Sequence, residues 1–189
     1  TAASTAAFMI YALLKHPALL AKIRPELDML FEEGGPTPQK MRDLDILHRV
    51  VLETLRRYPI APAIQRTVVK PFEYAGCRVE AGERIFIGTT VAHFIPEVHP
   101  DPYRFDIDRY LPERNEHRIP GAFAPFSLGA HTCLGAGLAE IQIMLTTATL
   151  LRYARFEMEP ADYQLKTRTA PTPAPAKSFR MRLVEKLPG

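Results

Sequence analysis

The chain has 189 residues, enough for one domain with a substantial core and short for two, and its formal net charge is +3 at pH 7. Hydrophobic residues make up 47% and charged residues 24%, which excludes a disordered or collagen-like chain. Only two cysteines occur, Cys77 and Cys133, so a disulfide-dense secreted scaffold and a four-cysteine zinc site are excluded. The mild charge gives no support for a nucleic-acid partner.

Three helices are predicted in the first third of the chain. The uncharged run 1–14 is apolar on nearly every face, which is typical of a buried helix, and it is too short for a membrane span of about 20 residues. A second helix begins at Pro17, and Pro25 should kink or delay it. A third runs from about Asp45 to Tyr58, with Arg49, Glu53 and Arg56 opposite its apolar stripe.

The remainder combines strands, a long irregular stretch and one long helix. Two β-prone runs, 64–69 and 84–90, enclose turns and predict a small sheet. Residues 96–125 are rich in proline, charge and aromatic rings, a composition that predicts a functional irregular segment. A helix is expected from about Ala136 to Arg155, followed by a tail strand in which Phe179, Met181 and Leu183 alternate with arginines. The fold class is therefore mainly α with a small antiparallel β-sheet.

The densest chemical signal is the segment F-S-L-G-A-H-T-C-L-G at 126–135, where Cys133 stands just before the last helix. The positive end of a helix dipole favours the thiolate form of a cysteine, which is ready to bind a metal. Three other interpretations stay open at this point. Cys133 is a small buried apolar residue, a zinc ligand beside His131 with help from Cys77, or a protease nucleophile with His93 or His99 as base.

This segment has the form Phe-x-x-Gly-x-His-x-Cys-x-Gly, which resembles the haem-ligand signature of the cytochrome P450 haem-thiolate monooxygenases. The resemblance implies that Cys133 is the axial ligand of the iron of haem b, donating electron density that favours O–O cleavage. It also implies that Phe126, Gly129 and Gly135 belong to the cofactor-binding segment. His131 matches a contact with one haem propionate, and Arg66 falls where the family often places a cation for the other.

Two further stretches resemble family motifs in the family's order. Glu53-Thr54-Leu55-Arg56 resembles the Glu-x-x-Arg motif, and the segment 105–110 resembles the later one that carries Arg109. Helical spacing alone predicts that Glu53 and Arg56 form a surface pair of little energetic value. The resemblance implies instead that Glu53, Arg56 and Arg109 form a structural charge cluster that locks the loop before the cysteine.

Thr1 corresponds to the alcohol in the middle of the family's long central helix, which helps to deliver protons during oxygen activation. Thr5 is the second choice. The competing interpretation is a helix threonine whose hydroxyl bonds back to its own backbone.

The resemblance covers residues 1–189 as a single partial domain, the C-terminal, haem-binding portion of the family's fold, with the N-terminal portion absent. It implies a cytoplasmic monooxygenase that inserts one oxygen atom from O2 into a small apolar organic substrate. A ferredoxin or flavodoxin would supply electrons at a basic face near Arg104, Arg114, His117 and Arg118. No membrane segment is expected in this chain. The alternatives are a peroxygenase or isomerase of the same haem-thiolate type, and a non-catalytic haem-binding fragment.

Overall fold

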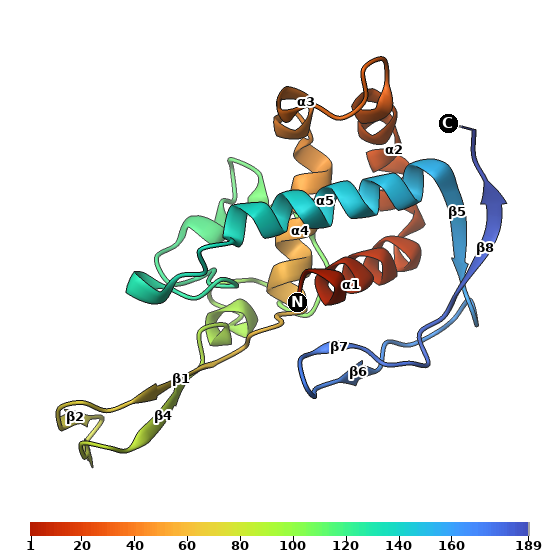
Figure 1. Ribbon diagram of the computed structural model, residues 1–189. Helices are drawn as coiled ribbons and strands as arrows, with labels where there is room; N and C mark the ends of the chain where they lie inside the picture. Colours follow the sequence, from red (N-terminus) through yellow and green to blue (C-terminus); the bar gives the residue numbers. More distant parts are fainter. Residues whose placement is uncertain (189) are drawn as a thin grey trace.

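The computed structural model describes residues 1–188, which form a mainly helical body with short strands (Figure 1). The α-helices are α1 (Ala2–Lys15), α2 (Pro17–Phe31), α3 (Pro38–Arg42), α4 (Asp45–Arg57) and α5 (Ala136–Tyr153). The 3-10 helices are η1 (Val91–Phe94), η2 (Ile107–Tyr110), η3 (Glu116–Arg118) and η4 (Gly129–His131). The strands are β1 (Ile64–Thr67), β2 (Phe72–Tyr74), β3 (Cys77–Val79), β4 (Arg84–Ile87), β5 (Ala154–Met158), β6 (Thr167–Arg168), β7 (Ala174–Pro175) and β8 (Met181–Lys186).

Helix α1 is buried, as its uncharged sequence predicts. Met9 and Leu13 are fully shielded from solvent, and Phe8 is only 1% exposed. Full burial of an apolar side chain of this size contributes about 1.5–3 kcal/mol. Because this helix is apolar on nearly every face, it occupies the interior between α4 and α5 rather than the surface (Figure 1).

Helix α2 begins at Pro17, as predicted, and continues through Pro25 to Phe31. The expected delay of the helix at Pro25 is therefore wrong. A proline inside a helix removes the bond to the carbonyl four residues earlier, and here that carbonyl belongs to the exposed Ala21, where water can take over. The inner face, with Ile23, Leu27 and Leu30 fully buried, holds the helix in place.

The core lies where four helices meet. One cluster joins buried apolar side chains of α1, α2, α4 and α5, including Met9, Leu13, Ile23, Leu27, Leu47, Val50, Ile143 and Ala148. Helix α5 lies across α1 and α4 in Figure 1, so the segment that carries Cys133 into α5 is fixed against the helical body.

Within residues 1–188 the strands form four separate antiparallel ladders of two strands each, where the sequence predicts one small sheet. The pairs are β1 with β4, β2 with β3, β5 with β8, and β6 with β7. The β1–β4 and β2–β3 ladders project from the helical body, and the last strands run along its other side (Figure 1). The antiparallel, mainly helical fold class is confirmed, and the β structure is more divided than predicted.

The predicted ends of the last two elements need correction. Helix α5 ends at Tyr153, and Ala154 and Arg155 already belong to β5, which pairs with β8. Ala154 has extended backbone angles, φ −150° and ψ 145°, so the helix cannot continue to Arg155. The tail strand begins at Met181, and Phe179 precedes it.

In residues 1–188 no single helix is both long and apolar enough to cross a membrane. Helices α1 and α2 meet that requirement only when taken together, and they are bent by 114° relative to each other.

Candidate functional site

The segment 126–135 forms a closed loop that ends in α5. The backbone N–H of Cys133 donates to the carbonyl of Phe126 at 2.9 Å, which ties the two ends of the loop together. The N–H and the hydroxyl of Thr132 both donate to the carbonyl of Gly129, at 3.1 and 2.8 Å. Gly129 has φ +73°, in the left-handed region that favours glycine, and an added Cβ there would meet nothing within 4 Å. Glycine is therefore required by conformation and not by space.

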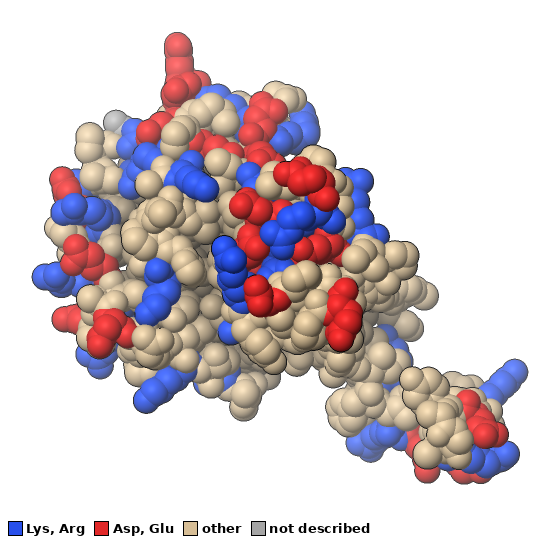
Figure 2. Space-filling view, turned by 180° about the vertical axis from the view of Figure 1, so that it is seen from behind, with Lys and Arg blue, Asp and Glu red and all other residues tan. Residues whose placement is uncertain are grey.

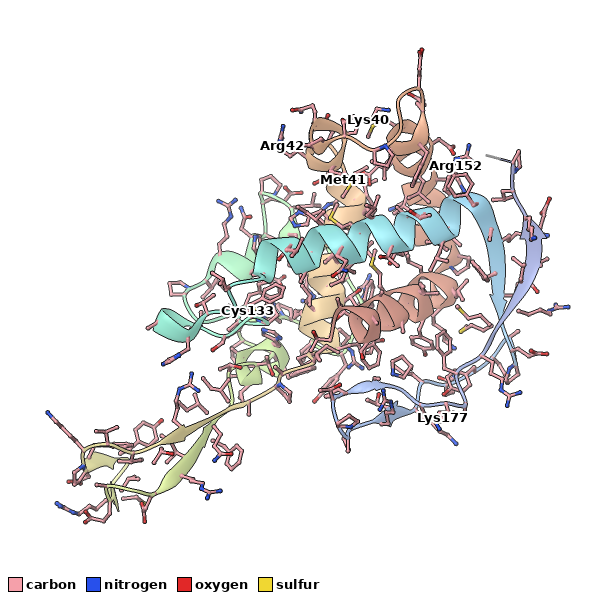
Figure 3. The ribbon with its side chains drawn as sticks, viewed as in Figure 1. Lys40, Met41, Arg42, Cys133, Arg152 and Lys177 are labelled. Carbon is pink, nitrogen blue, oxygen red and sulfur yellow. The ribbon has the colours of Figure 1, made fainter. Side chains whose placement is uncertain are left out.

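Cys133 lies two residues before Gly135, the residue that caps the N-terminus of α5. Its carbonyl accepts from the N–H of Ala136 at 3.3 Å, so the cysteine is bound into the helix start. The thiol is exposed, and Figure 3 places it on the loop that leads into α5. The interpretation of Cys133 as a small buried apolar residue is thereby wrong.

Cys133 opens into a cavity of about 240 Å³ with walls from three parts of the chain. Thr1 and Thr5 come from the start of α1, and Leu55 comes from α4. The remaining lining residues are Ala2, Ile60, Ala61, Ile64, Pro125, Phe126, Ser127, His131, Ala139 and Ile143. The walls are mainly apolar, and the thiol of Cys133 lines the same cavity as the two threonines at the start of α1.

Four of the predicted site residues line this cavity: Thr1, Phe126, His131 and Cys133. Gly129 and Gly135 shape the loop and are not among the lining residues. Arg66 is also not among them; it lies in β1, two residues after the lining residue Ile64, and its Nη1 donates to the carbonyl of Gln65 at 2.8 Å.

The two threonines differ in their surroundings. Thr1 is exposed and caps α1 without a side-chain hydrogen bond. Thr5 is 2% exposed, and its hydroxyl is 3.4 Å from the carbonyl of Thr1, to which it donates. The back-bonding that competes with a proton-delivery role is therefore present at Thr5.

The one cysteine of this cavity fits a metal whose remaining ligands come from a bound macrocycle and not from the protein. No group of three or more His, Cys, Asp or Glu side chains in residues 1–188 is placed to hold a metal ion, so the zinc interpretation has no ligand set. A single cysteine with apolar walls suits an iron whose other ligands belong to a porphyrin. The cavity also contains the Ser127 hydroxyl, a buried oxygen without a hydrogen-bond partner in the described part of the chain.

The protease interpretation fails on the histidines it requires. His93 Nδ1 lies 3.1 Å from the carbonyl of Arg56, and its Nε2 accepts from the N–H of Ala124 at 3.0 Å. His99 is held by Glu116 at 3.2 Å and by the carbonyl of Ala122 at 3.1 Å. Both rings are fully buried and have other partners, so neither activates Cys133.

Glu53 and Arg56 are not a surface pair. Both are completely buried, and two parallel bonds of 2.8 Å join the guanidinium to the carboxylate. Burial disfavours the charge on Arg56, but the hydrogen bonds and charge of Glu53 outweigh this and raise the pKa of the guanidinium. Helical spacing alone gives no sign of this burial, because the partners that cover the pair lie far along the chain.

Arg109 joins the same carboxylate from η2. Its Nε is 3.5 Å from Glu53 Oε1, its Nη1 donates to Glu116 at 2.8 Å, and its Nη2 donates to the carbonyl of Asp101 at 2.8 Å. The structure thus brings Glu53, Arg56 and Arg109 together around one buried carboxylate.

Sequence reasoning missed two members of this cluster. Tyr110 donates to Glu53 at 3.0 Å, and burial together with the Glu53 charge raises the pKa of its phenol well above the usual range. Glu116 accepts from Arg109, Arg114 and His99, and these bonds outweigh burial and lower the pKa of its carboxyl. A carboxylate in a charged stretch gives no sequence signal of burial, so Glu116 could not be singled out.

Comparison with known proteins adds the following findings. The family model described as Cytochrome P450 matches residues 1–179. A sterol 14alpha-demethylase of Mycolicibacterium vanbaalenii is 34% identical over 168 residues, covering 87% of this chain and 37% of that protein. A pentalenene oxygenase of Streptomyces avermitilis is 30% identical over 189 residues, covering 100% of this chain and 42% of that protein.

Among solved structures, the crystal structure of the cytochrome P450DA heme domain superposes with a TM-score of 0.86 at 29% identity. The match covers 100% of this chain and 42% of that one. The chain therefore spans about two fifths of the length of the relatives it matches.

Proposed function

The chain belongs to the cytochrome P450 family, and from this premise we propose that it is the haem-binding portion of a haem-thiolate monooxygenase. The whole protein would insert one oxygen atom from O2 into a small apolar organic substrate. The haem, when bound, supplies a redox-active iron that activates dioxygen. The observation that carries this proposal is the cavity that Cys133 shares with Thr1, Thr5 and Phe126.

In this proposal Cys133 holds the iron of haem b, and the loop gives the thiolate its position. The bond from the Cys133 N–H to the Phe126 carbonyl holds the backbones of these two residues together, and both residues line the cavity. His131 and Arg66 bind the two propionates, while Gly129 and Gly135 allow the backbone path of the loop. Arg66 would approach its propionate from β1, two residues after the lining residue Ile64.

Proton delivery falls to the start of α1. Thr1 lines the same cavity as Cys133, and its hydroxyl makes no capping bond, so it is free to orient a proton donor. Thr5 is the weaker candidate, since its hydroxyl already donates to the backbone.

The charge cluster of Glu53, Arg56 and Arg109 has a structural role in this proposal. Glu53 accepts from the N–H of Asp106, and Arg56 donates to the carbonyl of His93 at 2.6 Å. These bonds fix α4 against the irregular segment that leads to the cysteine loop.

The substrate and the donor follow from the family and from the surface. The apolar side chains Leu55, Ile60 and Ile64 line the cavity and support an apolar substrate. The names of two relatives, a sterol 14alpha-demethylase and a pentalenene oxygenase, support the same class of substrate.

The electron donor, a ferredoxin or flavodoxin, would approach near Arg104 and Arg118. Arg114 contributes less, because Asp106 and Glu116 neutralise it. Basic and acidic side chains intermingle on the face of the molecule seen in Figure 2. We place the protein in the cytoplasm as part of this proposal.

The test is the carbon monoxide difference spectrum of the reduced, haem-reconstituted chain. A red-shifted, thiolate-type Soret band is expected in the wild type and in Cys77→Ser, and its absence is expected in Cys133→Ser. Cys77 is the matched control, because it is the other exposed cysteine and lies on the projecting β3 strand. A band that survives in Cys133→Ser would overturn the assignment of the ligand.

A second candidate function is non-catalytic haem binding, which needs the Cys133 loop and its cavity but no proton donor at Thr1. A peroxygenase or isomerase of the same haem-thiolate type would need no electron donor. Turnover driven by hydrogen peroxide alone identifies the peroxygenase, and a thiolate-type spectrum without turnover under any donor identifies the binding fragment.

A further inference from the structure

His93 connects two walls of the cavity although it does not line the cavity itself. It lies in η1, where its ring is fully buried and stacks on Phe123 with centroids 5.4 Å apart. One ring nitrogen contacts the carbonyl of Arg56, and the other contacts the N–H of Ala124. The ring thereby touches the last turn of α4 and the segment just before the cysteine loop.

The two partners fix the protonation of the ring. The Ala124 N–H can only donate, so Nε2 must be the unprotonated acceptor at 3.0 Å. The Arg56 carbonyl can only accept, so Nδ1 must carry the proton at 3.1 Å. The result is a neutral ring in its Nδ1–H form. Burial, with the nearby charges of His99 and Arg56, lowers the pKa of His93 to about 4, which keeps this form dominant at neutral pH.

Both ends of this link continue directly into the cavity wall. Arg56 is followed, after the end of α4, by the lining residues Ile60 and Ala61. Ala124 is followed by the lining residues Pro125 and Phe126. The Ala124 carbonyl also accepts from the N–H of Ser127 at 3.1 Å, so the same residue contacts His93 through its N–H and starts the turn into the loop through its carbonyl.

We propose that His93 is a positioning residue that sets the distance between the end of α4 and the Cys133 loop through its neutral Nδ1–H ring. This inference rests on the proposed function, because the loop matters for the site only if Cys133 holds the cofactor. The bond to Ala124 is the part that controls the loop. The bond to Arg56 anchors the ring to the charge cluster.

The first test uses the unmutated chain of residues 1–189 without cofactor. Nitrogen-15 NMR of the histidine rings reports which ring nitrogen carries the proton. The proposal requires the Nδ1–H form for His93 at neutral pH. A protonated Nε2, or a ring that exchanges between both forms, would overturn it. This measurement does not depend on haem. It therefore still decides the protonation of His93 if the chain turns out not to bind haem.

The second test separates the two bonds. A glutamine at 93 places an acceptor near the position of Nε2, and an asparagine places a donor near the position of Nδ1. We expect the Ala124 amide to exchange with solvent at the wild-type rate in His93→Gln and at least tenfold faster in His93→Asn. After reconstitution with haem, the thiolate-type Soret band should persist in His93→Gln and be lost or shifted in His93→Asn.

His117→Gln is the matched control. The His117 ring also packs against Phe123, with centroids 6.3 Å apart, and its buried Nδ1 has no hydrogen-bond partner within the described residues. Its replacement should leave the exchange of Ala124 unchanged. Equal exchange rates in His93→Gln and His93→Asn would contradict the positioning role even if both variants were destabilised, because a purely structural ring would not distinguish the two bonds.

Discussion

Glu53 on α4 accepts a hydrogen bond of 2.9 Å from the backbone N–H of Asp106, which stands 53 residues later in the sequence. The same carboxylate accepts from Arg56 and Tyr110 and lies beside Arg109. A single buried side chain therefore fixes a helix, a 3-10 helix and the irregular segment between them. Removal of its charge should affect all three at once.

Glu53→Gln should lower the free energy of unfolding by about 3–5 kcal/mol, because it leaves the buried Arg56 and Arg109 cations without their shared carboxylate. Urea unfolding of the chain measures this loss. Asp45→Asn is the control, since Asp45 pairs with Arg49 while its side chain is 69% exposed, and its effect should stay below about 1 kcal/mol. Equal effects of the two variants would contradict the buried cluster.

Thr147→Val should stabilise the chain by about 1 kcal/mol. Thr147 is completely buried on α5, and its hydroxyl has no hydrogen-bond partner in residues 1–188, so valine removes an unsatisfied polar group at similar volume. Thr54→Val is the control, because the equally buried Thr54 hydroxyl donates to the Val50 carbonyl at 2.7 Å. Thermal or urea unfolding should show a gain for the first variant and little gain or a loss for the second.

Gly129→Ala should destabilise the loop by about 1–2 kcal/mol, because φ +73° is unfavourable for a residue with a Cβ. Gly137→Ala should instead stabilise the chain by up to about 1 kcal/mol, since Gly137 lies in the first turn of α5 and alanine favours a helix more than glycine does. An added Cβ meets nothing within 4 Å at either position, so the pair isolates backbone conformation from packing. Unfolding measurements on both variants should give opposite signs, and a loss of equal size in both would refute this explanation.

Stability should fall with acidification in a range set by His93. Its pKa is lowered from 6.5 to about 4 in the folded chain, so the unfolded chain takes up the proton first as the pH falls. The contribution of neutral His93 to the free energy of unfolding is complete above the pKa of the unfolded chain and decreases as the pH falls toward the pKa of the folded chain. Below the folded pKa the loss reaches about 3 kcal/mol.

Urea unfolding from about pH 8 to about pH 4 should show this slope, and His93→Gln should remove most of it. His16 and His117, whose pKa values burial also lowers, account for what remains. The carboxyls of Asp106 and Glu116 have lowered pKa values as well, so their contribution disappears at lower pH than that of His93. An unchanged slope in His93→Gln would mean that His93 is not the group that titrates.

Sequence predicts this fold well where periodicity or a motif carries the information. The uncharged run of α1 predicts burial, and the segment around Cys133 predicts the loop and the start of α5. Prediction from sequence fails where contacts between distant segments determine the local structure. Arg155 continues the helical pattern, yet pairing of β5 with β8 extends the backbone there. Local spacing places Glu53 and Arg56 on a surface, whereas Asp106, Tyr110 and Arg109 bury them.

The candidate site shows the same division. The motif identifies Cys133, Phe126 and His131, which meet in the cavity, but it cannot locate Arg66 relative to them. The sequence suggests no role for His93 other than a base, because nothing in it reveals that Arg56 and Ala124 occupy both ring nitrogens. Tertiary hydrogen bonds that determine a tautomer leave no trace in composition or spacing.

The cavity around Cys133 draws its walls from the first residues of the chain, from the end of α4 and from the start of α5. Contacts between such distant segments form only after long stretches of chain have closed into loops, which is the slow part of folding. Ligand capture at this site is accordingly coupled to the completed topology, and a bound cofactor would stabilise the native chain in proportion to its affinity. A chain divided at a connection between two helices, between α1 and the cysteine loop, would retain its helices and still lose the site, so cofactor uptake would serve as a readout of correct reassembly from two fragments.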